Sequence, residues 1–215
     1  DVRYKLMCRE PEKVLLKASH DGVPQMRERL FLVSIRRDLH EQYGISYEYP
    51  SPEYGPNQTH PYITVGDAIL DLPQVESGEE ITKYRLPKKF GSKEQERFIK
   101  IMRGFDVKDM KSEVPFYLIN SYDKKKSLSV HKGPGHLKRK KALLELTPQR
   151  SSMRAVYEAL QESGEISKYK HLFPNTIYGS RNRRLLDDQP SYTITSHCLD
   201  EMIHPYQHRA ITPRE

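Results

Sequence analysis

The chain has no tryptophan, only two cysteines and no long apolar run. Cys8 and Cys198 are too few for a disulfide framework. A membrane-spanning helix needs about 18 or more consecutive apolar residues, so none is predicted. The start of the chain does not resemble a signal peptide, and a cytoplasmic protein is expected. Fifteen prolines and fourteen tyrosines instead indicate much irregular, loop-rich structure.

Positive charge is in excess. The chain contains 36 lysines and arginines against 29 aspartates and glutamates, a formal net charge of +7. This balance favours a polyanionic partner, of which nucleic acid is the commonest. Two basic runs, at residues 124–126 and 138–141, are candidates for phosphate contacts, and Lys138 and Arg139 belong to the second. A solvated basic face would give the same pattern.

Local patterns predict short elements joined by loops. Three segments have the composition of short strands and are expected to form a small antiparallel unit: residues 4–8, 13–18 and 30–35. Three segments are predicted helices with capping residues or a glycine stop: 65–70 behind Thr64, 92–103 before Gly104, and 152–162 before Gly164. Further β structure is expected at 114–121 and 192–196. An α+β fold with few short helices follows.

A turn followed by alternating arginines is the most informative stretch. Gly22-Val23-Pro24-Gln25 predicts a rigid turn, and Arg27 and Arg29 follow it at positions i and i+2. On a strand these two side chains share one face, so they would form a two-pronged anion clamp on a buried strand. An edge strand with solvated charges is the alternative. Glu28 lies on the opposite face and is expected to pair with a nearby cation.

The last four residues, Thr212-Pro213-Arg214-Glu215, have the pattern of a helix start. Threonine at the N-cap, proline at N1 and glutamate at N3 form a capping box. We therefore expect the chain to be a piece of a longer protein, although a natural end that resembles a cap would look the same.

Several histidines and a cysteine near the end of the chain are residue types that can bind a metal ion. His197, Cys198, His204 and His208 lie close in sequence, but no Cys-x-x-Cys pair accompanies them and Pro205 interrupts a shared helix face. No metal site is expected, and these residues are predicted to lie in loops.

Residues 21–31, with Gln25, Arg27 and Arg29, resemble the Gln-x-Arg-x-Arg motif of DNA (cytosine-5) methyltransferases. Residues 62–73 are similar to the segment that opens the target-recognition region of that family. Residues 190–195, 203–205 and 209–215 resemble the end of that region and the motif after it. The resemblance implies an edge of the catalytic domain and its sheet at 1–40, a target-recognition domain at 41–211, and a truncated helix start at 212–215.

The resemblance implies a transferase that moves a methyl group from S-adenosylmethionine to C5 of a flipped cytosine in a specific duplex site. A bacterial restriction-modification system, with the protein on the nucleoid, is the expected setting. The family's Pro-Cys-Gln and Glu-Asn-Val motifs and its glycine-rich cofactor turn are absent. The chain alone is therefore expected to be inactive and to bind no cofactor. Double-stranded DNA is the expected partner, with no membrane and no obligate protein partner. The alternative is a freestanding basic nucleic-acid-binding module without catalytic activity.

The resemblance also assigns roles to residues. Arg29 is the candidate for the contact to the cytosine O2 atom, Arg27 for the nucleotide backbone or the catalytic loop, and Gln25 for the turn geometry. The implied DNA contacts come from the end of the recognition region and from the second basic run: Thr193, Ile194, Arg181, Asn182, Arg183, Arg184, Lys138 and Arg139. Asn182 is a candidate to read a base edge, or else a turn residue.

Overall fold

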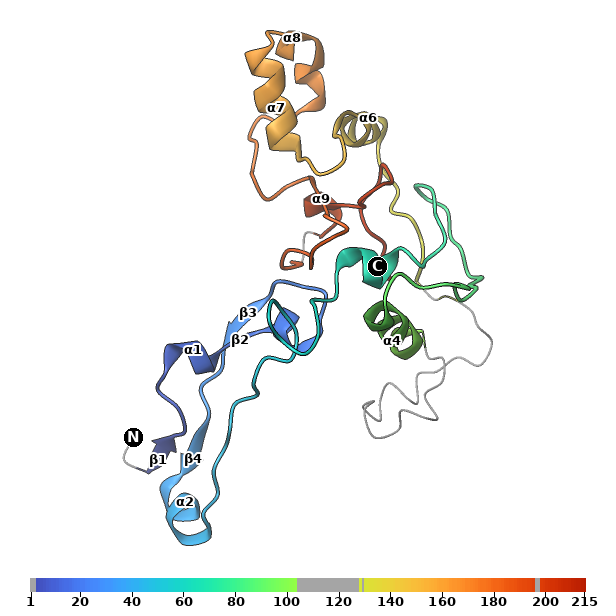
Figure 1. Ribbon diagram of the computed structural model, residues 1–215. Helices are drawn as coiled ribbons and strands as arrows, with labels where there is room; N and C mark the ends of the chain where they lie inside the picture. Colours follow the sequence, from blue (N-terminus) through green and yellow to red (C-terminus); the bar gives the residue numbers. More distant parts are fainter. Residues whose placement is uncertain (1–2, 104–127, 129, 196–197) are drawn as a thin grey trace.

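The computed structural model describes residues 3–103, 128, 130–195 and 198–215. The molecule is elongated: an N-terminal arm extends from a larger body, and the end of the chain lies within that body (Figure 1). Its short helices and small sheets confirm the predicted α+β fold. Among the described residues, none of the helices has the length and apolar content that crossing a bilayer requires.

The arm consists of two separate antiparallel ribbons. β1 pairs with β4, and β2 pairs with β3. The elements of the arm are, in chain order, β1 (Tyr4–Leu6), α1 (Pro11–Val14), β2 (Leu15–Lys17), η1 (Ala18–Asp21), β3 (Glu28–Leu30), β4 (Ser34–Arg36) and α2 (Arg37–Tyr43).

The apolar run after the two arginines does not form one buried strand. β3 ends at Leu30 and β4 begins at Ser34, and the side chains of Leu30 and Leu32 are 61% and 63% exposed. The prediction of a single buried strand at 30–35 was therefore wrong. Each ribbon has only two strands, so apolar side chains remain exposed to solvent. The strand predicted at 13–18 is also shorter, since α1 includes Val14.

The body contains helices predicted by their caps. The hydroxyls of Thr64, Ser92 and Ser152 each accept a hydrogen bond from the backbone N–H of the residue three positions later. The N···O distances are 3.1, 2.9 and 3.2 Å. The elements of the body are α3 (Val65–Ile69), α4 (Lys93–Met102), α6 (Lys138–Leu146), α7 (Met153–Glu162), α8 (Ile166–Tyr169), η2 (Lys170–Leu172), β5 (Arg183–Arg184), α9 (Cys198–Glu201) and β6 (Met202–Ile203).

Several helices were not predicted, among them the longer helices α2 and α6 and the four-residue helices α1, α8 and α9. α2 follows β4 directly, and α6 begins in the basic run, where the lysines obscured the apolar positions Leu143 and Leu144 that it buries. The strand expected at 114–121 and the basic run at 124–126 lie outside the described residues. The β-like segment after Ser191 forms no regular strand, although Ser191 itself forms a β-bridge with Gln25.

Two apolar clusters stabilise the body. The central one joins α3 to segments near the end of the chain, and Tyr192 and Ile194 pack against it. The second lies between α6, α7 and Phe173. Tyr192 and Ile194 therefore position the segment that contains Thr193 against the core.

A buried polar cluster holds the final segment in place. The Arg209 guanidinium donates to the Glu215 carboxylate at 2.7 and 2.6 Å, and both side chains are almost fully buried. Glu215 accepts the Thr212 N–H at 2.8 Å, and the Thr212 hydroxyl accepts the Glu215 N–H at 3.2 Å. These two bonds are the reciprocal pair of a capping box, as the pattern of residues 212–215 predicted.

His204 makes the stability of this cluster depend on pH. Its Nδ1 atom accepts the N–H groups of Tyr206 and Gln207 at 3.2 and 3.1 Å. Burial lowers the pKa of His204 to about 4. As pH falls, His204 therefore takes up a proton in the unfolded chain before it does so in the folded protein. The contribution of neutral His204 to stability is fully present above about pH 6.5 and decreases as pH falls from there to about pH 4.

We expect His204 to account for roughly 3 kcal/mol of this loss between pH 7 and pH 4. Urea unfolding across this range measures it. A His204→Asn variant, whose amide oxygen can replace Nδ1 as acceptor, should have a flatter profile. If both proteins lose stability equally, His204 is not the group that titrates.

Candidate nucleic-acid interface

The turn before the two arginines depends on a glycine. Gly22 has a φ of 78°, and a Cβ atom there would lie 2.9 Å from the ring of Tyr54. The Val23 N–H donates to Ala18 O at 3.1 Å, and the Gln25 N–H donates to Val23 O at 2.7 Å. The turn therefore leads into Gln25 with a defined geometry, as its sequence predicted.

This turn is joined to a segment that is far away in the sequence. The Met26 N–H donates to Ser191 O at 2.7 Å, and the Ser191 N–H donates to Pro24 O at 2.9 Å. The Thr193 hydroxyl adds a bond to Met26 O at 2.9 Å, across 167 positions of sequence. The structure thus brings Gln25 and Thr193, two of the predicted site residues, to one place. The neighbouring Ile194 packs against the central apolar cluster.

Arg29 lines a cavity of about 290 Å³ at this junction, together with Met26 and Thr193. Its guanidinium donates to Glu28 O at 2.7 Å. The Glu28 carboxylate pairs with Lys17 at 2.8 Å, which is the cation pairing expected for it. Arg27 is half-buried and does not line this cavity. The predicted two-pronged clamp is therefore represented here by Arg29 alone.

The arginine cluster before Tyr192 alternates between surface and interior. Arg181 stacks over the ring of Tyr178, 5.0 Å from its centroid, and Arg183 stacks over Tyr192 at 3.6 Å. Both arginines are partly exposed. Tyrosine rings that fix a cation in this way were not identified as site residues from the sequence, although their spacing to the arginines was visible.

Arg184 faces the interior, which corrects its prediction as a DNA contact. It is 2% exposed, and its five N–H groups have acceptors. They donate to the backbone oxygens of Thr147, His204, Gln207 and Leu144 and to Nδ1 of His208, at 2.8 to 3.1 Å. A guanidinium with all its donors occupied holds the fold together and has none left for a phosphate.

Asn182 is a turn residue, so the prediction that it reads a base edge was wrong. It is buried and has a φ of 53°. Its side-chain oxygen accepts from Lys140, and its N–H₂ group contacts the sulfur of Met153. Asparagine tolerates this left-handed conformation better than most residues, which accounts for its position.

The family model of C-5 cytosine-specific DNA methylases matches residues 10–215. The chain belongs to this family.

Several methylases resemble parts of the chain. Type II methyltransferase M.NgoFVII of Neisseria gonorrhoeae is 33% identical over 100 residues, 45% of this chain and 24% of that protein. Type II methyltransferase M.BspRI of Lysinibacillus sphaericus is 42% identical over 62 residues, 28% of this chain and 14% of that protein. The matched parts thus span about a quarter or less of these relatives.

A solved structure shares the fold. It is a DNA modification methyltransferase by description, encoded within an E. coli prophage, and it superposes with a TM-score of 0.54 at 18% identity. The alignment covers 99% of this chain and 49% of that one.

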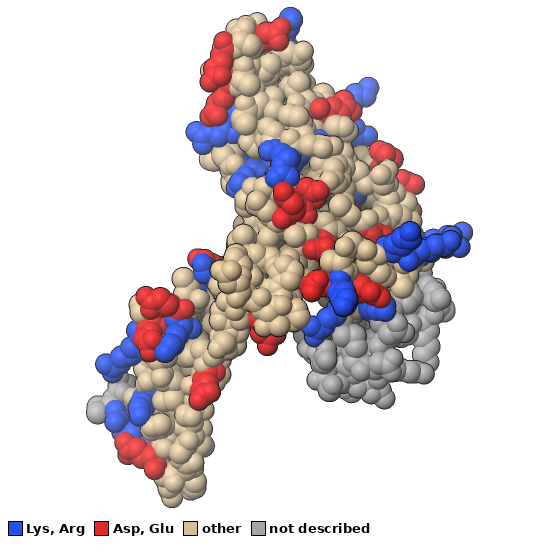
Figure 2. Space-filling view, in the orientation of Figure 1, with Lys and Arg blue, Asp and Glu red and all other residues tan. Residues whose placement is uncertain are grey.

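In this methylase-family chain, only some of the basic side chains of helix α6 are free to contact a DNA phosphate. Arg139 donates to Leu172 O and Phe173 O at 3.2 and 2.5 Å, so it anchors η2. Lys140 is 3.2 Å from Asp200, and burial lowers its pKa. Lys138 is exposed and remains a candidate phosphate contact. On the face shown in Figure 2, basic and acidic side chains are interspersed and form no single basic patch.

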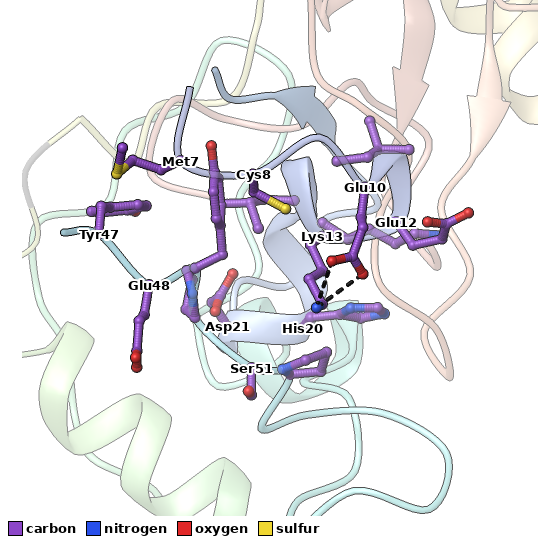
Figure 3. A pocket seen from close by; sticks show the side chains of 16 residues that line it. Met7, Cys8, Glu10, Glu12, Lys13, His20, Asp21, Tyr47, Glu48 and Ser51 are labelled. Carbon is purple, nitrogen blue, oxygen red and sulfur yellow. Dashed lines mark hydrogen bonds and ion pairs between the residues drawn. The ribbon is translucent and has the colours of Figure 1, made fainter. Parts of the chain in front are cut away.

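A cavity larger than the one beside Arg29 lies in the arm of this methylase-family chain, and Lys17 lines both cavities. It measures about 620 Å³ and is lined by residues from 7–21 and 47–52 (Figure 3). Lys13, which faces it, is paired with Glu10 at 2.9 Å. None of the predicted catalytic or DNA-binding residues lines it.

The described residues contain no group of three or more histidine, cysteine or acidic side chains that could hold a metal ion. His197 lies outside the described residues. His204 and His208 are engaged with the backbone and with Arg184.

Proposed function

We propose that this chain is the DNA-recognition part of a DNA (cytosine-5) methyltransferase of a bacterial restriction-modification system. The observation that carries the proposal is the set of bonds from Met26 to Ser191 and Thr193. These bonds join the Gln25–Arg29 segment to residues 191–193, and in the proposal a single nucleotide bound there contacts both.

The methyl donor is proposed to bind to a part of the enzyme other than these residues. Proteins of this family bind S-adenosylmethionine at a glycine-rich turn between a strand and a helix. Within the described ranges, β4 continues into α2 without a glycine, and β2 leads into η1 before Gly22. None of the described residues is therefore assigned to the cofactor or to the nucleophile, and the chain alone is proposed to be inactive.

Arg29 is proposed to stabilise charge on the target base. Cytosine must leave the base stack before C5 and C6 can react. When a nucleophile adds to C6, electron density moves toward O2 and N3, and a cation placed at O2 stabilises that charge as an oxyanion hole does. The bond from Arg29 to Glu28 O orients the fork, and the Lys17–Glu28 pair neutralises the neighbouring carboxylate.

Arg181 and Arg183 are proposed to contact the DNA outside the target base. Stacking on Tyr178 and Tyr192 fixes the planes of their guanidiniums before DNA binds. A fixed fork suits bidentate contact with a phosphate or with a guanine edge, at a lower entropic cost than a mobile side chain.

Methyl transfer tests the function directly. The enzyme that contains this chain should convert cytosine to 5-methylcytosine in duplex DNA, as shown by mass analysis of the digested nucleosides. A protein that binds duplex DNA but yields no 5-methylcytosine would instead support a freestanding binding module.

Salt dependence tests the two stacked arginines. We expect Arg181→Ala and Arg183→Ala each to weaken duplex binding. Each should reduce the slope of the logarithm of the binding constant against the logarithm of the salt concentration by about 1, because each removes one contact between a cation and a DNA phosphate. Titrations by fluorescence anisotropy at several salt concentrations measure the slope. Arg154→Ala is the control, since Arg154 is exposed and paired with Glu158 on α7. An unchanged slope in both arginine variants would exclude them from the interface.

A further inference from the structure

The cavity beside Arg29 has an aromatic wall to which neither the sequence nor the family resemblance assigns a role. Its lining residues come from the arm, from the segment before α3 and from the end of the recognition region: Lys17, Ser19, Met26, Glu28, Arg29, Tyr62 and Thr193. Its volume of about 290 Å³ is close to the lower end, roughly 300 Å³, of pockets that hold small molecules. Tyr62 is the aromatic member of this set.

The ring of Tyr62 is fixed from two directions. The imidazole of His20 stacks against it, with centroids 6.0 Å apart and planes within 7° of parallel. Gly55 lies against the hydroxyl end of the ring, where a Cβ atom would be 3.1 Å from Cζ and from the hydroxyl oxygen. His20 lines the larger cavity of the arm and is not among the lining residues of the cavity beside Arg29. The ring is thus preorganised.

The charges of the cavity suit one nucleotide. Lys17 and Glu28 neutralise each other at 2.8 Å, which leaves the guanidinium of Arg29 as the uncompensated charge among the lining residues. A single cation next to a fixed aromatic ring matches a planar base that carries a polar oxygen. An aromatic face binds a base by stacking whatever its identity.

We infer that Tyr62 is the stacking wall for the flipped target cytosine, whose exocyclic O2 atom Arg29 binds. This inference rests on the proposed function, because it assigns the ligand of the same site. Tyr62 contributes binding energy for the extruded base, and Arg29 contributes charge stabilisation during the reaction.

The test is a comparison of two duplexes in the enzyme that contains this chain. One duplex carries the target cytosine and the other carries an abasic site at that position. Tyr62→Ala should weaken binding of the first duplex by roughly tenfold and leave binding of the second unchanged, because only the first offers a base to stack. Tyr62→Phe should bind both as the unmodified enzyme does. Tyr62→Leu, which keeps bulk without an aromatic face, should behave like Tyr62→Ala even where the alanine variant folds poorly.

Other outcomes overturn the inference. Equal losses for both duplexes would make Tyr62 a structural residue, and a loss in Tyr62→Phe would assign the effect to its hydroxyl. Tyr47→Ala removes a tyrosine that lines the large cavity of the arm and should change neither affinity. If 5-methylcytosine forms but the two duplexes respond alike, the Tyr62 inference fails and the proposed function stands. If no 5-methylcytosine forms, the proposed function itself fails.

Discussion

Replacing Arg29 by alanine in the enzyme that contains this chain is expected to lower kcat by about 100-fold or more and to change the Kd for duplex DNA little. The proposed contact to O2 strengthens as charge develops, so its loss falls on the transition state. Removal of one oxyanion donor costs roughly 10²–10³ in kcat in other enzymes. Single-turnover methyl transfer and a separate binding titration measure the two quantities.

Two variants sharpen this result. Arg29→Lys retains a charge but not the planar fork, so it should recover only part of the lost rate. Arg36→Ala is the control, because Arg36 lies on the same arm and is paired with Asp38 at 2.6 Å in an exposed position. If Arg29→Ala lowers affinity as much as turnover, Arg29 is an ordinary phosphate contact.

The elements that could be predicted from the sequence depend on local chemistry. Thr64, Ser92 and Ser152 cap helices with bonds to residues three positions onward, and such bonds need no tertiary partner. Gly22 and Gly164 have positive φ angles of 78° and 75°, as their turn and helix-stop patterns required. Because these interactions join residues that are close in the sequence, they can be predicted from the sequence.

The positions of the site residues depend on contacts that no local pattern contains. Thr193 reaches Met26 across 167 positions, and only the family resemblance related the two segments beforehand. The burial of individual side chains was even harder to predict from the sequence. Arg183 and Arg184 are adjacent and chemically identical, yet the pairing of β5 with β6 leaves one at the surface and turns the other inward. Leu30 and Leu32 had the composition of a core strand, but the two-stranded ribbons do not cover them.

The inward position of Arg184 leads to the second large effect, on stability. Arg184→Met keeps most of the apolar stem but removes all five donors, so the carbonyls of Thr147, Leu144, His204 and Gln207 lose a bond inside the body. Each such loss costs about 1–3 kcal/mol when no water replaces the donor. Partial relaxation reduces the sum, and we expect the free energy of unfolding to fall by about 4 kcal/mol.

The neighbouring residue provides the matched control. Arg183→Met removes a guanidinium stacked on Tyr192 at a partly exposed site and should cost about 1 kcal/mol or less. Urea unfolding of both variants, followed by two spectroscopic probes, measures the difference. DNA binding separates the roles further: Arg183→Met should weaken binding with little loss of stability, and Arg184→Met should do the reverse at temperatures where it remains folded. If Arg184→Met instead keeps its stability and loses DNA affinity, the side chain leaves the interior when DNA binds, and the original prediction of a DNA contact is restored.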